Sequence, residues 1–238
     1  MPTTADTPKC FAEVRGKRII DRDLEAFDTV GLKDICFIGG YQIEKVRAAY
    51  PHFTFRHNAD WERNNILASL MHAEDLMQAP FLCCYSDILF TADVLQRLLS
   101  NSADIAISVD TRWLERYQFR TQHPPEDAEK VTAENGCVTR IHRGIEPRAA
   151  HGEYTGIAKF TEAGASALNA HYHRCRSRYA GNSFREAATF EKAYLIHLFQ
   201  DMIEAGVKLA HADTPGGYLE VDTQQDFDLA QKFWPGEP

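Results

Sequence analysis

Two aspartates stand directly after apolar runs that have the composition of buried strands. Asp87 follows "FLCCYS" and Asp222 follows "YLEV". Open α/β sheets bind ligands beyond the carboxyl ends of their strands, so both carboxylates are placed to reach a ligand. Such a pair suits a hard cation such as Mg²⁺, which bridges to substrate phosphates, and disfavours zinc. The alternative is that either aspartate caps a turn or helix, because Thr91 and Thr223 follow closely.

A third candidate lies near the start of the sequence. The stretch "TADTPK" places Lys9 directly behind Pro8, before the first apolar run. Proline fixes its own backbone angle, so a lysine held behind it suits a loop that binds an anion.

Other catalytic patterns are absent or incomplete. His171, His173 and Cys175 have a spacing that could ligate a metal, but no second pair completes the site, so an exposed helix or loop is the favoured interpretation. Neither GxSxG nor HExxH occurs, and Gly39 and Gly40 lack the remaining glycine of a dinucleotide fingerprint. The sequence therefore gives no support to a serine hydrolase, a zinc protease or an NAD enzyme.

The elements that must position the two aspartates alternate through the first half of the chain. Apolar strand patterns occur at 35–40, 53–57, 81–85 and 104–110, and helical spacing occurs at 41–50 and 64–78 and again after Thr91. This order predicts an α/β, Rossmann-like fold with a mostly parallel central sheet flanked by helices.

After residue 110 the rhythm breaks. Two short strands around Asn135 and Gly136 predict a hairpin, so we expect a small β insertion there. The segment 152–160 predicts a further strand, and Thr161 is positioned to cap the helix that follows it. A long amphipathic helix is predicted over 184–206, ending at a glycine. Two strands and a helix over 207–233 close the chain.

Composition excludes some classes of function. The net charge of −8 and the pI near 5.7 oppose nucleic-acid binding, because that requires a basic face. The basic cluster over 171–185 is local and is expected to be a solvated face. The six cysteines contain no CxxC pair, and there is no signal-like start and no apolar stretch of about 18 residues. These features predict a cytoplasmic protein with reduced thiols and no membrane partner.

Seven motifs taken together resemble a known family. They are "TADTPKCFAEVRGKRIID", "FIGGY", "NADWERNNILASL", "CYSDILF", "EDAEKV", "GEYTGIAKF" and "LEVDTQQDFDLA". In this order they resemble nucleotidyltransferases of the GT-A-like fold, and most of all the phosphocholine and phosphonate (2-aminoethylphosphonate type) cytidylyltransferases. The segment "NNILASL" distinguishes this group, because sugar-phosphate enzymes usually have a Gly-rich turn there. The resemblance implies one nucleotidyltransferase domain over 1–238, with a nucleotide-binding half at about 1–110 and an acceptor-binding half at about 111–238.

The resemblance also implies roles for individual residues. Lys9 would contact phosphate, and Asp87 and Asp222 would hold Mg²⁺. The residues expected near the nucleotide are Asn58, Asn64, Asn65, Ser69 and Ser86. The residues expected at the acceptor are Glu153, Tyr154, Lys130 and Trp113, for each of which a structural role in the core or at a strand edge is the alternative.

The implied reaction moves a cytidylyl group from CTP to phosphocholine or a small phosphonate and releases pyrophosphate. The acceptor is already anionic and nucleophilic, so the enzyme needs geometry and cations rather than a Ser or Cys nucleophile. An ammonium head group on the acceptor would favour aromatic faces and a carboxylate, for which Trp113, Tyr117, Tyr154 and Glu153 are candidates.

One family feature is missing from this sequence. Family members begin with a strand and a GxGxR-like loop that binds the triphosphate, whereas Thr3 and Thr4 stand here where that segment would end. The expectation is that the strand and loop precede Met1, through a start codon assigned too late or a domain cut from a longer chain. The alternatives are a non-catalytic remnant of the fold and, as another enzyme, a sugar-1-phosphate nucleotidyltransferase. A homodimer is left open.

Overall fold

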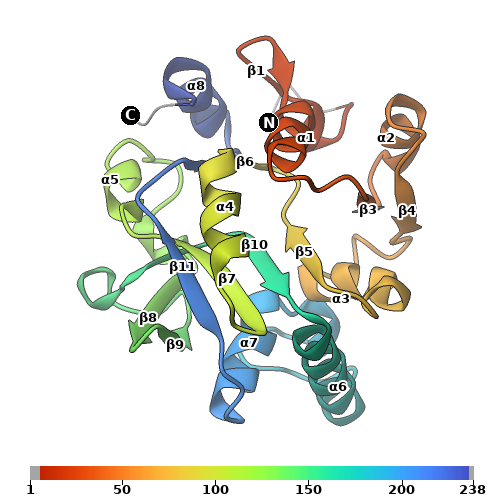
Figure 1. The fold of residues 1–238 in the computed structure, drawn as a ribbon, viewed down its shortest axis with the longest axis vertical. Helices are drawn as coiled ribbons and strands as arrows, with labels where there is room; N and C mark the ends of the chain where they lie inside the picture. The colour runs from red at the N-terminus through yellow and green to blue at the C-terminus, as the bar shows by residue number, and fades with distance from the viewer. Residues whose placement is uncertain (1–5, 236–238) are drawn as a thin grey trace.

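The computed structural model describes residues 6–235, in which a six-stranded sheet runs through the middle of the molecule (Figure 1). Its strands, in spatial order, are β5 (Phe81–Cys84), β10 (Gly152–Phe160), β7 (Ile105–Asp110), β11 (Ala210–Thr214), β9 (Cys137–Ile141) and β8 (Lys130–Glu134). Within this sheet, as described for residues 6–235, only β7 and β11 pair in parallel, and β10 runs antiparallel to both β5 and β7. The α/β class is confirmed, but the sheet is mixed rather than mostly parallel.

The predicted hairpin explains the mixed sheet. β8 and β9 pair around Asn135 and Gly136, as the sequence indicates. β8 pairs also with the start of β10, and β9 with the start of β11. The hairpin therefore connects β10 and β11, the two strands on either side of β7. The chain then enters β10 from the hairpin rather than through a crossover helix, and short connections of this kind join antiparallel strands.

Helices cover both faces of the sheet. On one face, α4 (Ala92–Ser100) packs over β11, and α1 (Ile19–Thr29) packs against α4 and against β6 (Ile88–Phe90), a strand outside this sheet. On the other, α6 (Glu162–Tyr179) and α7 (Leu195–Glu204) pack over β10 and β9 (Figure 1). Neighbouring residues of β5 join the two sides, because Cys83 packs against the core cluster under α6 and α7 and Cys84 against the cluster under α1 and α4. All six cysteines are free thiols.

In the part of the chain that the structure describes, three two-stranded pairs lie outside this sheet. They are β1 (Glu13–Val14) with β2 (Lys17–Arg18), β3 (Cys36–Gly39) with β4 (Thr54–His57), and β6 (Ile88–Phe90) with β12 (Tyr218–Glu220). The helix α2 (Ile43–Ala49) joins the parallel strands β3 and β4. Within residues 6–235, β3 pairs only with β4 and β5 only with β10. Thr3 and Thr4 lie outside the described residues, and the strand and loop expected before Met1 stay a prediction.

Several helix predictions need correction. The segment 64–78 forms a short helix, α3 (Ile66–Leu70), followed by a 3-10 turn, and Asn65 caps it through its side chain. The long helix predicted over 184–206 begins only at Leu195, because Phe184 and Phe190 are drawn into the core by a chain that turns around Arg185 in a left-handed conformation. The helix α1 was not predicted.

The remaining helices follow the sequence more closely. Thr161 caps α6 by accepting a hydrogen bond from Gly164, and Thr223 caps α8 (Gln224–Phe233). A further helix, α5 (Trp113–Tyr117), lies in the segment without clear periodicity. The basic cluster lies partly on α6, as expected for a helix, but His171 and Cys175 are buried rather than exposed. None of the helices within residues 6–235 is both long and apolar enough to cross a membrane.

Candidate active site

The pairing of β6 with β12 brings the two predicted aspartates together. Asp87 immediately precedes β6, and Asp222 follows β12 by two residues. The strands are antiparallel, with Glu220 opposite Ile88, and the backbone N–H of Val221 donates to the carbonyl of Asp87 at 2.9 Å. Neither aspartate caps a helix, because Thr91 precedes α4 and Thr223 precedes α8. The helix-cap alternative left open by the sequence is therefore wrong for both.

Lys9 lies between these two carboxylates. Its ammonium nitrogen Nζ is 2.5 Å from Asp222 Oδ1 and 3.3 Å from Asp87 Oδ2. Burial acts to lower the pKa of Lys9, but the charges of the two aspartates outweigh it, and the pKa lies above its ordinary value. The space between the aspartates thus favours a cation, and its donors are carboxylate oxygens, the ligands that Mg²⁺ prefers.

The two aspartates differ in their electrostatic surroundings. Burial raises the pKa of Asp87, against the opposing charge of Lys9. A hydrogen bond with His123, whose Nε2 lies 3.4 Å from Oδ2, and the charge of Lys9 hold the pKa of Asp222 below its ordinary value. Burial and the neighbouring charge of Asp222 raise the pKa of Glu220 to about 8. Of these three carboxyl groups, Asp222 is the one whose surroundings favour the charged form.

A second layer of hydrogen bonds fixes the chain around Asp222. Asp226 Oδ2 accepts from the backbone N–H groups of Asp222 and Thr223, at 3.2 and 2.9 Å. Arg120 donates to Asp226 at 2.7 Å and to Glu220 at 3.1 Å. Glu220 could have been found from the sequence, since it lies two residues before Asp222 on the same strand pattern. His123 and Arg120 carry no such signal.

Asp87 and Asp222 line a cavity of about 510 Å³. Its wall is formed by five tyrosines, six carboxylates and a few other side chains: Tyr85, Tyr117, Tyr154, Tyr194, Tyr218, Asp87, Asp127, Glu129, Glu153, Glu220, Asp222, His123, Arg143, Asn65, Ile66 and Ser86. A cavity of this size is large enough for a small organic ligand. The two aspartates and the cavity therefore form one site.

The residues predicted near the nucleotide fall into two groups. Asn65 and Ser86 line the cavity. Asn58 and Asn64 exchange two amide hydrogen bonds of 2.8 Å, and Asn58 donates a third to Ser69 Oγ at 2.8 Å. Asn58 is almost fully buried, so this network holds the segment before α3 in place and does not line the cavity.

The residues predicted at the acceptor divide in the same way. Glu153 and Tyr154 line the cavity, and so does Tyr117. Lys130 and Trp113 do not, because both are buried beside it. Lys130 donates to three backbone carbonyls, those of Pro125, Glu126 and Ala128, and its Nζ lies 5.8 Å from the centre of the Trp113 ring. These two side chains support the loop that carries Asp127 rather than a ligand.

Three buried polar atoms of cavity residues have no hydrogen-bond partner among the described residues. They are the hydroxyl of Tyr154, Nε of Arg143 and Nδ1 of His123, the last of which lies 3.8 Å from Asp127. Glu153, by contrast, accepts from Arg116 at 2.6 Å and from Tyr117 at 2.7 Å. A buried polar atom left without a partner costs free energy. The Tyr154 hydroxyl and Arg143 Nε are therefore positioned to contact a bound ligand. Arg143 was missed by the sequence analysis, because nothing in its segment indicates a site.

Glu129 makes stability depend on pH. Burial raises its pKa to about 7, although Arg143 opposes this at 3.3 Å, and 11% of its side chain is exposed. Between its ordinary value of 4.5 and about 7, the folded state holds a proton that the unfolded state has released, so stability falls as pH rises. Between pH 5 and pH 8, the free energy of unfolding of the wild type should fall by about 3 kcal/mol more than that of Glu129→Gln. Urea unfolding at the two pH values measures the difference.

The matched control for this measurement is Glu134→Gln, at an exposed position of β8. Its loss of unfolding free energy between the two pH values should equal that of the wild type. Equal losses in the wild type and in Glu129→Gln would show that Glu129 is not protonated in the folded state at pH 5 and above.

Comparison with known proteins gives relatives over most of the chain. Residues 3–163 match the MobA-like NTP transferase domain. The chain is 27% identical over 241 residues to the CTP:phosphoglutamine cytidylyltransferase of Campylobacter jejuni subsp. jejuni, covering 96% of this chain and 93% of that protein. It is 26% identical over 241 residues to the UTP--glucose-1-phosphate uridylyltransferase AglF of Haloferax volcanii, covering 97% and 89%.

A solved structure shows the same fold. The CTP:phosphocholine cytidylyltransferase from Streptococcus pneumoniae matches with a TM-score of 0.69 and 16% identity, covering 97% of this chain and 91% of that one. At this identity the likeness is one of fold. The match to the MobA-like NTP transferase domain spans more than half of the 238 residues. We conclude that the chain belongs to the family of MobA-like NTP transferase domains, and is a nucleotidyltransferase.

Proposed function

We propose that this chain transfers a cytidylyl group from CTP to a small phosphorylated or phosphonate acceptor and releases pyrophosphate, with Mg²⁺ held by Asp87 and Asp222. The observation that carries the proposal is the convergence of both carboxylates on the Lys9 ammonium, at 3.3 and 2.5 Å, beside the cavity that both line. The resemblance to two proteins named as cytidylyltransferases supports CTP as the donor.

The chain's residues would act by binding and orientation. No Ser or Cys nucleophile is required, since the phosphate or phosphonate of the acceptor attacks the α-phosphorus of CTP directly, and the bond to the leaving pyrophosphate breaks. Holding both anions in line contributes on the order of 7–11 kcal/mol. Lys9, once its carboxylate partners bind the metal, is free to contact the triphosphate. Bound Mg²⁺ supplies the positive charge that offsets repulsion between the anions and stabilises pyrophosphate.

The cavity favours an acceptor with a positively charged nitrogen. Among the described residues its wall contains six carboxyl groups and one arginine, Arg143, and five tyrosines contribute aromatic surface. The pKa values of two of the carboxyl groups, Glu129 and Glu220, are raised by burial, and a bound cation would favour their charged form. An ammonium or quaternary ammonium group is attracted to both kinds of surface. Phosphocholine and aminoalkylphosphonates combine such a nitrogen with the reacting anion, so we infer that the acceptor belongs to this class.

A sugar 1-phosphate is the second candidate acceptor, supported by the relative named as a glucose-1-phosphate uridylyltransferase. The purified protein should be assayed for pyrophosphate release with each NTP, against phosphocholine, 2-aminoethylphosphonate and glucose 1-phosphate. Turnover with CTP and an amine-bearing acceptor is expected. Turnover with glucose 1-phosphate alone would contradict the acceptor class. No turnover, together with no Mg²⁺-dependent thermal shift with CTP, would indicate a non-catalytic remnant.

Tyr154→Phe tests the acceptor end of the cavity. The variant keeps the ring, which packs edge-on against Phe199 in the core, and removes only the unpartnered hydroxyl. Loss of one hydrogen bond to the acceptor should raise the acceptor KM about 3- to 10-fold and leave the CTP KM unchanged. Tyr179→Phe, on α6 and away from the cavity, is the control and should change neither KM. An unchanged acceptor KM in Tyr154→Phe would remove Tyr154 from the acceptor pocket.

A further inference from the structure

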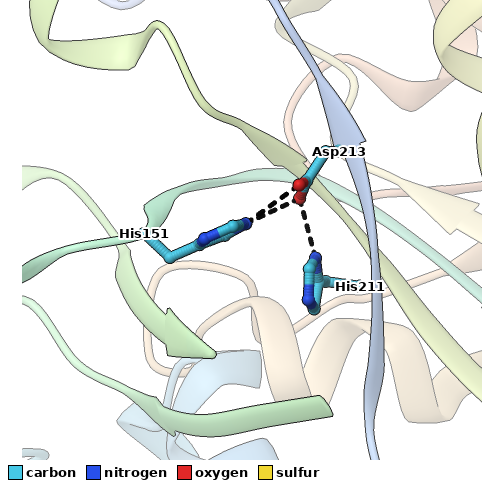
Figure 2. A group of neighbouring side chains, drawn as sticks. All are labelled: His151, His211 and Asp213. Carbon is cyan, nitrogen blue, oxygen red and sulfur yellow. Dashed lines mark hydrogen bonds and ion pairs between the residues drawn. The ribbon is translucent and has the colours of Figure 1, made fainter. Parts of the chain in front are cut away.

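A cluster of two histidines and an aspartate lies outside the cavity. The carboxylate of Asp213 contacts both rings: His151 Nε2 lies 2.9 and 3.0 Å from its two oxygens, and His211 Nδ1 lies 2.7 Å from Oδ1. The ring centres of the two histidines are 4.7 Å apart. Figure 2 shows both rings directed at the carboxylate, each through one nitrogen.

The sheet itself builds this cluster. His211 and Asp213 occupy alternate positions of β11, so their side chains leave the same face of the strand. The residues between and beside them, Ala210 and Ala212, pack against the opposite core cluster. His151 comes from the residue before β10, where its backbone N–H donates to the carbonyl of Val131 at 2.8 Å. Two backbone segments fixed by the sheet, β11 and the residue before β10, therefore deliver the three side chains.

We propose that His151, His211 and Asp213 bind a Zn²⁺ ion. The three ligand atoms already lie within 4.8 Å of one another. In a tetrahedral Zn²⁺ site the ligand atoms are about 3.4 Å apart, so atoms that now lie between 2.7 and 4.8 Å from one another need shifts of about an ångström to enclose the ion. Two imidazoles and a carboxylate are a ligand set that suits Zn²⁺ and leaves a fourth position for water. The side chains of His151 and Asp213 are 32% and 41% exposed, which gives the ion a route in.

Two further clusters in the described residues offer metal-type ligands but fit less well. His171, Cys175 and Asp201 are close together, yet Arg174 contacts His171 and Arg185 contacts Asp201, and these cations oppose a metal ion. The third cluster contains His123 and Asp222 and belongs to the active site. No arginine or lysine contact is made to His151, His211 or Asp213 by the residues from 6 to 235.

The ion would join two segments that lead into the active site. β11 continues to β12 and Asp222, and His151 lies two residues before Glu153 and three before Tyr154. A cross-link between these segments stabilises the folded state, because Zn²⁺ binds the folded site and not the separated chain. We therefore assign this ion a stabilising role, with three protein ligands rather than the four of a closed structural site, and separate from the cation proposed at Asp87 and Asp222.

The proposal is tested by titrating Zn²⁺ alone into the metal-free full-length protein by calorimetry and following the thermal midpoint. The wild type should bind one equivalent of Zn²⁺. In His151→Gln and in His211→Asn the affinity for this equivalent should fall by at least about 100-fold, because losing even a supporting hydrogen bond to a ligand lowers metal affinity by about 10- to 100-fold. The Zn²⁺-dependent rise in thermal midpoint should shrink in both variants. Co²⁺ in place of Zn²⁺ should give a visible absorption band in the wild type that both variants lack.

His72→Ala is the control, because His72 is exposed and lies outside the three clusters. It should keep the wild-type stoichiometry, affinity and Co²⁺ band. Circular dichroism of the metal-free variants establishes that they are folded. The proposal is overturned if folded His151→Gln and His211→Asn bind Zn²⁺ as tightly as His72→Ala, or if the wild type binds no equivalent that depends on either histidine.

Discussion

Asp222→Asn is expected to lower kcat/KM for nucleotidyl transfer by at least about 1,000-fold, or about 4 kcal/mol of transition-state stabilisation. The substitution keeps the size of the side chain and removes its negative charge. His123 and Lys9 hold the pKa of Asp222 low, so this carboxylate is charged at neutral pH in the wild type. Asp87→Asn should have a similar effect. The measurement is steady-state pyrophosphate release with CTP and the acceptor at saturating Mg²⁺.

The control for the aspartate variants is Asp93→Asn. Asp93 lies on the exposed face of α4, where its partner among residues 6–235 is Arg97, one helical turn away. Its kcat/KM should equal that of the wild type. If Asp222→Asn retained more than about a tenth of wild-type activity, the carboxylate would not hold the catalytic cation, because loss of a transition-state charge contact costs far more than about 1.4 kcal/mol.

Arg116→Ala is expected to lower the free energy of unfolding by about 3–5 kcal/mol, because it leaves two buried carboxylates without their cation. Arg116 Nη2 lies 2.6 Å from Glu153 and 2.8 Å from Asp110, and 3% of its side chain is exposed. Its guanidinium also stacks 4.7 Å from the centre of the Tyr218 ring. Urea unfolding at neutral pH measures the difference.

An exposed ion pair provides the comparison for Arg116. Arg97→Ala removes the partner of Asp93 on the surface of α4, and such pairs contribute about 0.5 kcal/mol or less. If the free energy of unfolding of Arg116→Ala fell by less than about 1 kcal/mol, water or a rearrangement would be replacing the arginine as the partner of Asp110 and Glu153. Because Glu153 lines the cavity, the variant is also expected to weaken acceptor binding.

The positions of Asp87, Asp222 and Lys9 could be predicted because local sequence signals identify them. Each aspartate ends an apolar run, and each run forms a strand, β5 or β12. What could not be predicted is how the two meet. β6 and β12 are three residues each and lie more than a hundred residues apart, so no periodicity reveals that they pair. Their pairing is set by packing against α1 and α8.

The acceptor residues show a different limit. Trp113 and Lys130 have residue types that suit a ligand pocket, and both are instead buried beside it. Lys130 can be buried because its ammonium group donates to three backbone carbonyls of the loop around Pro125. These contacts arise only in the folded structure. Glu129 and Arg143 are separated by a hairpin and meet only because β8 and β9 fold back on each other. Single-residue patterns cannot indicate contacts of this kind.

The most direct test of the account is a label-transfer experiment with CTP labelled at either the α- or the γ-phosphate and phosphocholine or 2-aminoethylphosphonate as acceptor. The account predicts that the α-label appears in a cytidylyl-linked acceptor and the γ-label in pyrophosphate, that both transfers require Mg²⁺, and that Asp87→Asn and Asp222→Asn abolish them. Transfer of the α-label that is independent of Mg²⁺ or unaffected in these two variants would contradict it, as would the absence of any labelled product with every acceptor and nucleotide.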